Sequence, residues 1–316
     1  MRILVTGGAG FIGSNIVERL LELGHEPIVF DNLSSGYFEN LVPGVKFFEG
    51  DVRNQMQLIE AAKDCKVILH LAASVGNKRS IDHPQSDSEI NLIGSLNVLE
   101  TARTLGIKRI VFSSSAGIFG ELKTLPINEN HPQMPDSPYG VSKLAAEKMC
   151  LVYNKLYYMQ NICLRYFNVF GPHQRYDAYG NVIPIFANRL LRREPLLIFG
   201  DGEQTRDFVN VHDVAEVNIN AALGSDKIKG VFNIGSGTRV SINELVRIMQ
   251  KVSGINTEVE YGAPRMGDVR DSLADISAAH QYLGFSPKVN LNSGLLEYWN
   301  WISQDLISND NSACRS

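Results

Sequence analysis

The first half of the chain alternates short apolar runs with stretches of helical periodicity. Apolar runs typical of buried strands recur up to residue 164, at Ile3–Val5, Pro27–Phe30, Val45–Phe48, Val67–Leu71, Ile110–Phe112 and Ile162–Leu164. Helical patterns lie between several of them, notably over residues 12–23, 88–105 and 139–158. Strands that alternate with helices are typical of βαβ units. We therefore predict an α/β fold in which a doubly wound parallel sheet is covered by helices on both faces.

The second half is less regular and predicts a smaller second domain. It carries turn-rich segments at residues 171–181 and 200–206, but also strand-like runs at Phe208–Val211 and Gly230–Ile234. We assign residues 1–172 and about 207–236 to the sheet domain, and about 173–206 and 237–302 to a C-terminal substrate-binding domain. Residues 303–316 are polar and rich in Ser and Asn, so we expect a frayed tail there.

Composition narrows the class of protein. The 316 residues are 44% hydrophobic, enough for a sizeable core, and their formal net charge is -4. This mildly acidic balance argues against nucleic acid or an anionic membrane as the main partner. No apolar stretch reaches the ~18 residues of a membrane helix. The N-terminus does not match a signal peptide, and the histidines show no metal-ligand spacing. We expect a cytoplasmic protein without a metal site.

A glycine-rich loop follows the first apolar run. Residues 6–13 read TGGAGFIG and lead directly into the first helical pattern. Glycines here allow a tight turn, close approach of the backbone to a pyrophosphate and close packing of helix on strand. The helix N-terminus then offers N–H groups to the phosphates. This arrangement is typical of Rossmann domains that bind a dinucleotide.

Two acidic positions after later strands refine the cofactor. Asp31, at the end of the second strand, would accept hydrogen bonds from the adenosine ribose and repel a 2′-phosphate, which favours NAD over NADP. Asp51 and Val52 follow the third strand-like run, where they either reach the adenine edge or belong to a turn.

A second group of residues predicts proton transfer. Tyr139 and Lys143 are four residues apart in a helical pattern and so share one helical face. A nearby ammonium favours phenolate and lowers the pKa of a tyrosine, which would make Tyr139 a general base. Ser115 ends the fifth strand pattern, where open α/β sheets bind ligands, and could hydrogen-bond both Tyr139 and a substrate hydroxyl. Ser113 and Ser114 are expected in a turn.

Together these motifs resemble the extended short-chain dehydrogenase/reductase family, and within it the NAD-dependent nucleotide-sugar epimerases. The resemblance runs from Met1 to about residue 300. It rests on TGGAGFIG (6–13), HLAA (70–73), Asn91, the three serines, SPYGVSKLAAE (137–147), RYFNVFGP (165–172), GDGEQTRDF (200–208) and PRMGDVRDSLAD (264–275). It implies an enzyme that uses NAD, acts on a UDP-sugar, and forms a homodimer through the helices at residues 88–105 and 139–158.

The resemblance also assigns roles to individual residues. The implied catalytic residues are Tyr139, Lys143 and Ser115. Implied contacts with NAD are made by Gly7, Gly10, Phe11, Ile12, Gly13, Asp31, Asn32, Asp51, Val52, Leu71, Ala72, Ala73, Asn91, Ser113, Tyr139, Lys143 and Tyr166. Implied contacts with the nucleotide sugar are made by Ser115, Asn168, Asn181, Arg206, Arg265, Asp268 and Ser272.

The residues after the catalytic serine select one reaction within the family. Related sugar dehydratases and decarboxylating enzymes carry titratable residues there, whereas this chain has Ala116 and Gly117. The resemblance therefore implies C4 epimerisation of a UDP-hexose through a transient 4-keto intermediate. A nucleotide-sugar 4-keto reductase or dehydrogenase and a uronate 4-epimerase are alternatives, as is a non-catalytic dinucleotide sensor.

Three further positions bear on the substrate. Ser272 is small where related epimerases can carry a restrictive tyrosine, so UDP-N-acetylhexosamines should fit as well as UDP-glucose and UDP-galactose. Phe119 stands where the family often has tyrosine, which would remove a hydroxyl near the site. Residues 76–79 (GNKR) would lie over the sugar ring, where Lys78 and Arg79 either contact a phosphate or a sugar carboxylate or belong to a solvated loop.

Overall fold

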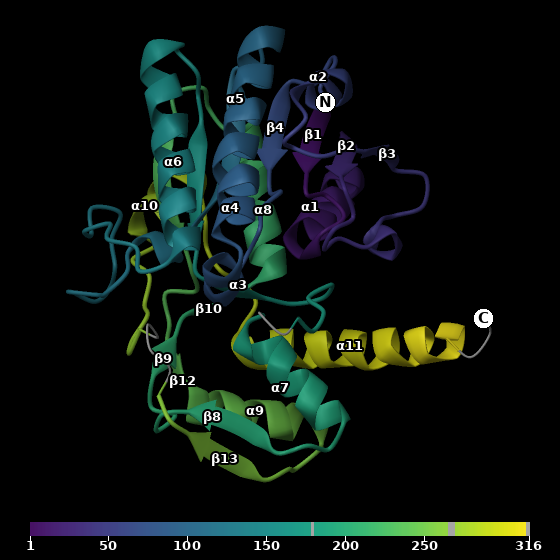
Figure 1. Cartoon of the computed structure of the whole chain (residues 1–316), viewed down its shortest axis with the longest axis vertical. Helices are drawn as coiled ribbons and strands as arrows, with labels where there is room; N and C mark the ends of the chain where they lie inside the picture. Colours follow the sequence, from purple (N-terminus) through teal and green to yellow (C-terminus); the bar gives the residue numbers. More distant parts are fainter. Residues whose placement is uncertain (178–179, 265–268, 314–316) are drawn as a thin grey trace.

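A computed structural model describes the backbone of residues 1–177, 180–264 and 269–313, and the side chains of these ranges up to residue 305. Within them, seven parallel strands form one sheet in the order β11-β6-β5-β4-β1-β2-β3 (Figure 1). The strands are β1 (Arg2–Thr6), β2 (Glu26–Asp31), β3 (Lys46–Glu49), β4 (Val67–His70), β5 (Arg109–Ser115), β6 (Ile162–Tyr166) and β11 (Gly230–Ile234). The chain reverses its direction of winding between β1 and β4, which is where such sheets bind ligands.

Helices cover both faces of this sheet, as the sequence predicted. Alternate residues of β1 point to opposite faces: Ile3 and Val5 join one apolar cluster, and Leu4 joins the other. On the first face pack α1 (Phe11–Glu22), α8 (Val211–Leu223) and α10 (Ser277–Leu283). On the second face pack α2 (Gln55–Ala61), α5 (Gly94–Leu105) and α6 (Pro138–Leu156). The predicted α/β class with a doubly wound parallel sheet is confirmed.

A smaller group of elements has its own apolar core. It contains the helices α7 (Val182–Leu191), α9 (Ile242–Ser253) and α11 (Leu291–Ala313), together with a parallel pair formed by β8 (Leu196–Phe199) and β13 (Val259–Gly262). Two further pairs lie between this core and the large sheet in Figure 1: β7 (Asn168–Phe170) with β10 (Phe208–Asn210), and β9 (Thr205–Arg206) with β12 (Val240–Ser241).

The structure differs from the predicted elements in three places. The helix predicted over residues 88–105 is α4 (Pro84–Ser88), a turn of π-helix (Glu89–Ile93) and α5 in succession, preceded by the short helix α3 (Asn77–Asp82). Ser113 and Ser114 belong to β5 instead of a turn, because both pair with residues of β6. The tail predicted from residue 303 is helical as far as Ala313, because Tyr298 and Ile302 anchor α11 in the smaller core.

None of the described helices combines the length and the apolar character that crossing a lipid bilayer requires.

Candidate active site

The glycine loop joins β1 to α1 and leaves no room for side chains at two positions. A Cβ on Gly7, whose φ is +69°, would lie 2.6 Å from the backbone nitrogen of Ala72. A Cβ on Gly13 would lie 2.1 Å from the carbonyl oxygen of Gly7. The loop is therefore pressed between the end of β4 and the first turn of α1. Gly10 occupies the N-cap of α1, and the first turn holds no acidic residue, so its N–H groups suit a phosphate.

Asp31 ends β2 beside this loop, and Asp51 follows the end of the neighbouring strand β3. The Asp31 carboxylate accepts hydrogen bonds from the amides of Ala9 (3.0 Å) and Leu33 (2.9 Å). Burial raises the pKa of Asp31, although these amides oppose that shift. Asp51 accepts from the Asn32 amide group at 2.9 Å, and its bonds to Arg53 lower its pKa to about 2. Asp51 is thus bound mainly by its own turn.

Ser115 and Tyr139 meet at the carboxyl edge of the sheet. Ser115 ends β5, and its Oγ accepts a hydrogen bond from the Gly117 amide at 3.1 Å. Ser115 also lies close enough to the phenol of Tyr139, in the first turn of α6, to lower the pKa of that phenol. A Cβ on Gly117 would lie 3.3 Å from the Ser115 Oγ and 3.5 Å from the Tyr139 ring. The Ala116–Gly117 pair therefore lines the reacting groups and offers them no proton.

Tyr139 differs from the prediction in one respect. The sequence predicted that Lys143 would lower the pKa of Tyr139. In the structure the pKa of Tyr139 is raised, because burial outweighs the hydrogen bond with Ser115 that lowers it. The negative charge of Asp87 raises this pKa further.

Lys143 lies one turn along α6 in the interior of the protein. Its side chain is 2% exposed, its Nζ lies 3.5 Å from the Ser113 hydroxyl, and it is 4.4 Å from the centre of the Phe112 ring. Burial lowers the pKa of Lys143 to about 8. The ammonium therefore lies beside Ser113 and Phe112 of β5, and Lys143 shares a helical face with Tyr139.

A buried polar network that the sequence did not reveal supports these groups. Asp87, 1% exposed, accepts hydrogen bonds from the Ser142 hydroxyl (2.5 Å) and the Asn91 amide group (2.9 Å). Asn91 also exchanges bonds of 2.9 Å with the backbone of Ser74, just after β4. The π-helical turn carries Asn91 to this position, and such turns often mark functional sites. The network fixes α6 against the loop after β4.

The side chains of Ser114, Tyr166 and Phe119 make contacts within the protein. The Ser114 hydroxyl donates to Glu147 at 2.7 Å, and the Tyr166 hydroxyl donates to Asn218 of α8 at 2.9 Å. Phe119 is fully buried and packs on the guanidinium of Arg165 at 5.2 Å. The ring at this position, where the family often has tyrosine, belongs to a small apolar core with Ile118, Ile127 and Phe167.

The predicted sugar-nucleotide residues lie on the smaller elements. Asn168 opens β7 and Arg206 ends β9, and Asn181 is the N-cap residue of α7. Ser272 is 6% exposed and lies beyond β13 in the chain. Arg265 and Asp268 lie outside the described residues.

Asp207 connects these elements, and sequence reasoning missed it. Its carboxylate accepts bonds from the Ser236 amide (2.6 Å) and hydroxyl (2.7 Å), the Gly237 amide (3.1 Å) and the Ala274 amide (3.1 Å). Its carbonyl accepts from the Asn168 side chain at 3.1 Å. The segment carrying Arg206 is thereby tied to the end of β11 and to the segment carrying Ser272. Asp207 directly follows Arg206 in the motif GDGEQTRDF (200–208), and this position could have marked it as a candidate site residue.

Residues 76–79 precede and open α3, beside the N-terminus of α6. Asn77 accepts a hydrogen bond from Ser137, the N-cap residue of α6, at 3.0 Å. The Lys78 ammonium pairs with Asp82 at 2.8 Å, and Arg79 pairs with Asp177. Residues 76–79 therefore contact the N-terminus of α6, but Asn77, Lys78 and Arg79 belong to a helix instead of a loop. Lys78 and Arg79 both form ion pairs with carboxylates of this chain.

The residues present fit NAD. The loop that Gly7 and Gly13 allow, the open N-terminus of α1 and the carboxylate of Asp31 line the carboxyl edge of β1 and β2. Ser115, Tyr139 and Lys143 follow at the edge of β5 on the other side of the switch point. An extended dinucleotide crosses such a switch point, with its phosphates at the helix N-terminus.

Comparisons with known proteins agree with this geometry. Residues 3–235 match the NAD dependent epimerase/dehydratase family. A UDP-glucose 4-epimerase of Mycolicibacterium smegmatis is 37% identical over 305 residues, which are 93% of this chain and 96% of the relative.

Two solved structures share the whole fold. A UDP-glucose 4-epimerase of Thermotoga maritima with UDP-glucose has a TM-score of 0.92 at 39% identity and covers 97% of this chain and 100% of its own. A UDP-N-acetylglucosamine 4-epimerase of Methanobrevibacter ruminantium, in complex with UDP-N-acetylmuramic acid, has a TM-score of 0.92 at 35% identity. The match covers 96% of this chain and 98% of that chain. The chain therefore belongs to the NAD-dependent epimerase/dehydratase family and is a homologue of UDP-sugar 4-epimerases.

Proposed function

We propose that this protein interconverts UDP-hexoses that differ in configuration at C4. The observation that carries the proposal is that Ser115 and the Tyr139 ring both lie against Gly117, with the buried Lys143 ammonium at Ser113 of the same strand. This set can move one proton at a sugar hydroxyl, and it holds no further acid or base of the kind that elimination requires. The named 4-epimerases among its relatives support the same reaction.

The residues of the chain divide the work as follows. NAD would supply the redox chemistry, as acceptor and then donor of one hydride, and the positive charge of its oxidised form would favour the phenolate of Tyr139. Tyr139 would take the proton of the C4 hydroxyl, which Ser115 would orient, and would later return it to the ketone oxygen. Lys143 would stabilise the phenolate and hold the nicotinamide ribose. Asn168, Asn181, Arg206, Arg265 and Asp268 anchor the UDP group while the 4-keto sugar turns over.

We propose further that N-acetylated sugars are substrates as well as UDP-glucose and UDP-galactose. The support from the sequence is that Ser272 is small at a position where related epimerases can carry a restrictive tyrosine. The similarity to a UDP-N-acetylglucosamine 4-epimerase supports this range. The uronate alternative loses its main support, because Lys78 and Arg79 bind Asp82 and Asp177.

Proton NMR of the anomeric signals tests the reaction. The purified protein is incubated with UDP-glucose or UDP-N-acetylglucosamine, without added NAD. We expect both C4 epimers to appear from each sugar, without net NADH. Failure with both sugars after NAD⁺ is added would contradict the proposal, and net NADH production or consumption would favour a dehydrogenase or reductase. Conversion of UDP-glucose alone would contradict only the inference from Ser272.

We also propose a homodimer formed through α5 and α6. The two helices pack together (Figure 1). Several apolar residues of α6 are exposed, among them Met149, Val152 and Leu156. Such a stripe is typical of a helical interface. Light scattering should give twice the chain mass, and Val152→Glu should shift the protein toward monomer.

A further inference from the structure

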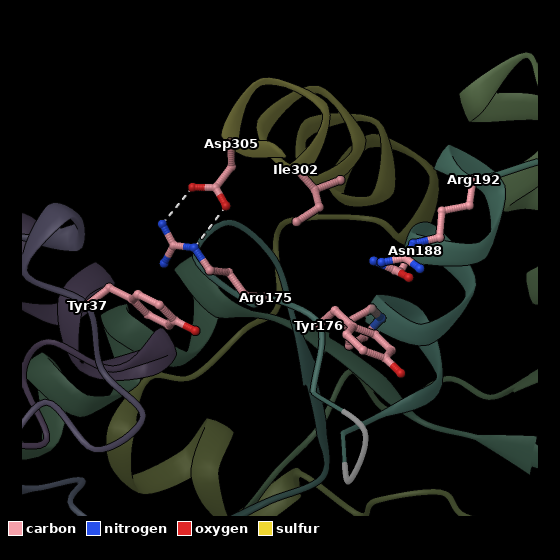
Figure 2. A pocket seen from close by; sticks show the side chains of 8 residues that line it. Tyr37, Arg175, Tyr176, Asn188, Arg192, Ile302 and Asp305 are labelled. Carbon is pink, nitrogen blue, oxygen red and sulfur yellow. Dashed lines mark hydrogen bonds and ion pairs between the residues drawn. The ribbon is translucent and has the colours of Figure 1, made fainter. Parts of the chain in front are cut away.

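The side chain of Arg175 joins the C-terminal helix to the segment after β2 (Figure 2). Its Nε and Nη2 donate to the two carboxylate oxygens of Asp305, on α11, at 2.8 and 2.6 Å. Its Nη1 donates to the Asn40 side-chain oxygen at 2.7 Å. The guanidinium lies between aromatic rings, 4.2 Å from the centre of Tyr37 and 5.3 Å from that of Trp301. The side chains of Arg175 and Asp305 are 15% and 14% exposed, so this ion pair is largely shielded from water.

Asn40 continues this connection into the glycine loop. Its Nδ2 donates to the carbonyl of Ala9 at 2.9 Å, and the Tyr37 amide donates to the same oxygen at 3.0 Å. Ala9 stands between Gly7 and Gly10, in the turn that faces the pyrophosphate. Its own amide donates to Asp31, the carboxylate expected on the adenosine ribose. One continuous chain of contacts therefore runs from α11 to both groups that would hold the dinucleotide.

A second contact reaches the other side of the same loop. The hydroxyl of Ser14, in the first turns of α1, hydrogen-bonds His173 at 2.8 Å. Asn15 donates to the carbonyl of Pro172 at 3.1 Å. The His173 ring packs edge-on against Trp301 of α11, at 5.6 Å between ring centres. Residues 172–175 and α11 thus contact the glycine loop from two directions.

We infer that Arg175 and Asp305 form a clamp that keeps NAD bound through successive turnovers. The contacts of Arg175 and Asn40 tie the loop around Ala9 and the segment 31–41 to the smaller core, and the inference is that the dinucleotide leaves when these two segments move apart. Breaking the clamp lowers the cost of this local opening and so raises the dissociation rate. Arg175 and Asp305 are positioning residues, because they act on the cofactor through Asn40 and Ala9. The inference rests on the proposed function only in requiring that NAD be the resident cofactor.

The test compares the exchange of bound NAD in three variants of the full chain. Each protein is loaded with NAD, mixed with an excess of isotope-labelled NAD, and sampled to follow loss of the unlabelled molecule. Arg175→Met keeps much of the bulk of the side chain but removes the guanidinium and its three hydrogen bonds. Asp305→Asn keeps the shape of the side chain but removes its charge. Arg19→Met is the control, because it breaks an exposed ion pair between α1 and α8 on the same fold.

We expect exchange at least tenfold faster in Arg175→Met, a smaller acceleration in Asp305→Asn, and the parent rate in Arg19→Met. Parent-like exchange in both clamp variants overturns the inference, as does equal acceleration in the control. A lowered melting temperature without faster exchange shows a merely structural role and also overturns it. Exchange of bound NAD needs no sugar substrate. If NAD exchange changes in the variants as expected but the NMR assay shows no epimerisation, the proposed reaction is contradicted and the inference about Arg175 and Asp305 is still supported.

Discussion

Tyr139 is held between opposing influences on its proton. Burial and the charge of Asp87 favour the neutral phenol, whereas the bond with Ser115 favours the phenolate. The side chain therefore needs a further positive charge before it can act as a base near neutral pH, and a bound oxidised nicotinamide would supply it.

Replacing the phenol tests its role directly. In Tyr139→Phe the ring still fills its space, but the proton acceptor is gone. General acid–base groups contribute about 10²–10⁴-fold to a rate, so kcat should fall by about that factor while the protein still binds NAD. Anomeric NMR gives the rate, and absorbance of the denatured supernatant gives the NAD content. Near-normal turnover would remove Tyr139 from the mechanism.

Asp87 should set the pH at which the site works. A negative charge disfavours phenolate and favours ammonium, so Asp87 raises the pKa of both Tyr139 and Lys143. Asp87→Asn removes that charge but keeps the shape, so both pKa values should fall. The acid and alkaline limbs of the kcat/KM profile should then both move to lower pH.

The control for this prediction is Ser142→Ala, which removes a bond to Asp87 and leaves its charge. Other groups acting on Lys143 are Glu147, Cys150 and Cys163, and none of them changes. If Asp87→Asn lowers activity equally at every pH, its part is only to hold α6 in place.

The site could be predicted from the sequence where neighbours in the chain are also neighbours in space. Tyr139 and Lys143 share a helical face, and Ser115 ends a strand, so both features follow from local periodicity. Asp87 gave no such signal, since its partner Ser142 lies 55 residues away. Its role depends on how α4 packs on α6, which local pattern does not encode.

At the scale of elements, the loop between β1 and α1 depends on close packing. Gly13 lies within α1 and needs no unusual φ, but a Cβ there would meet the Gly7 carbonyl at 2.1 Å. Gly13→Ala should therefore push α1 away from the loop and cost about 1–3 kcal/mol of unfolding free energy. It should also lower NAD affinity.

Chemical denaturation and NAD titration measure these two effects. Glu18→Ala, on the exposed side of the same helix, is the matched control and should change neither. A Gly13→Ala protein with parent-like stability and NAD affinity would show that the loop adapts.

Helices and strands were predicted correctly where the hydrophobic residues recur with a clear helical or strand period. Each strand predicted in the first half exists, and α1 begins and ends within one residue of the pattern at 12–23. The π-helical turn was not predicted, because a single extra residue in a helix leaves almost no trace in hydrophobic spacing. The extension of α11 past residue 303 was missed because polar residues dominate its last turns, while its anchors lie earlier in the helix.

At the scale of the molecule, one buried ion pair joins elements that are distant in the chain. Arg165 of β6 donates to Glu147 of α6 at 2.7 and 2.9 Å, and to the carbonyl of Glu129 at 2.8 Å. The Glu129 carboxylate in turn accepts from the Asn233 amide of β11 at 2.8 Å. The catalytic helix, the sheet and the loop after β5 therefore share one polar centre.

Removing one charge from this centre should be costly. Glu147→Gln would leave the Arg165 guanidinium buried without its counter-charge, a change that typically costs about 3–5 kcal/mol. Ser114→Ala, which removes only a neutral hydroxyl bound to the same carboxylate, should cost about 1 kcal/mol. Equilibrium denaturation of both variants measures the difference, and equal losses would show that the pair adds no more than one hydrogen bond.

The two edge strands of the large sheet, β3 and β11, also affect whether the protein aggregates in concentrated solution. β3 is four residues long and has Lys46 and Glu49 at its ends, while β11 is five residues long and begins at Gly230. Short edge strands, and charged ones, give another copy little continuous backbone to pair with. Molecules that collide should therefore separate again instead of stacking sheet to sheet, and a concentrated solution should stay free of fibrous aggregates.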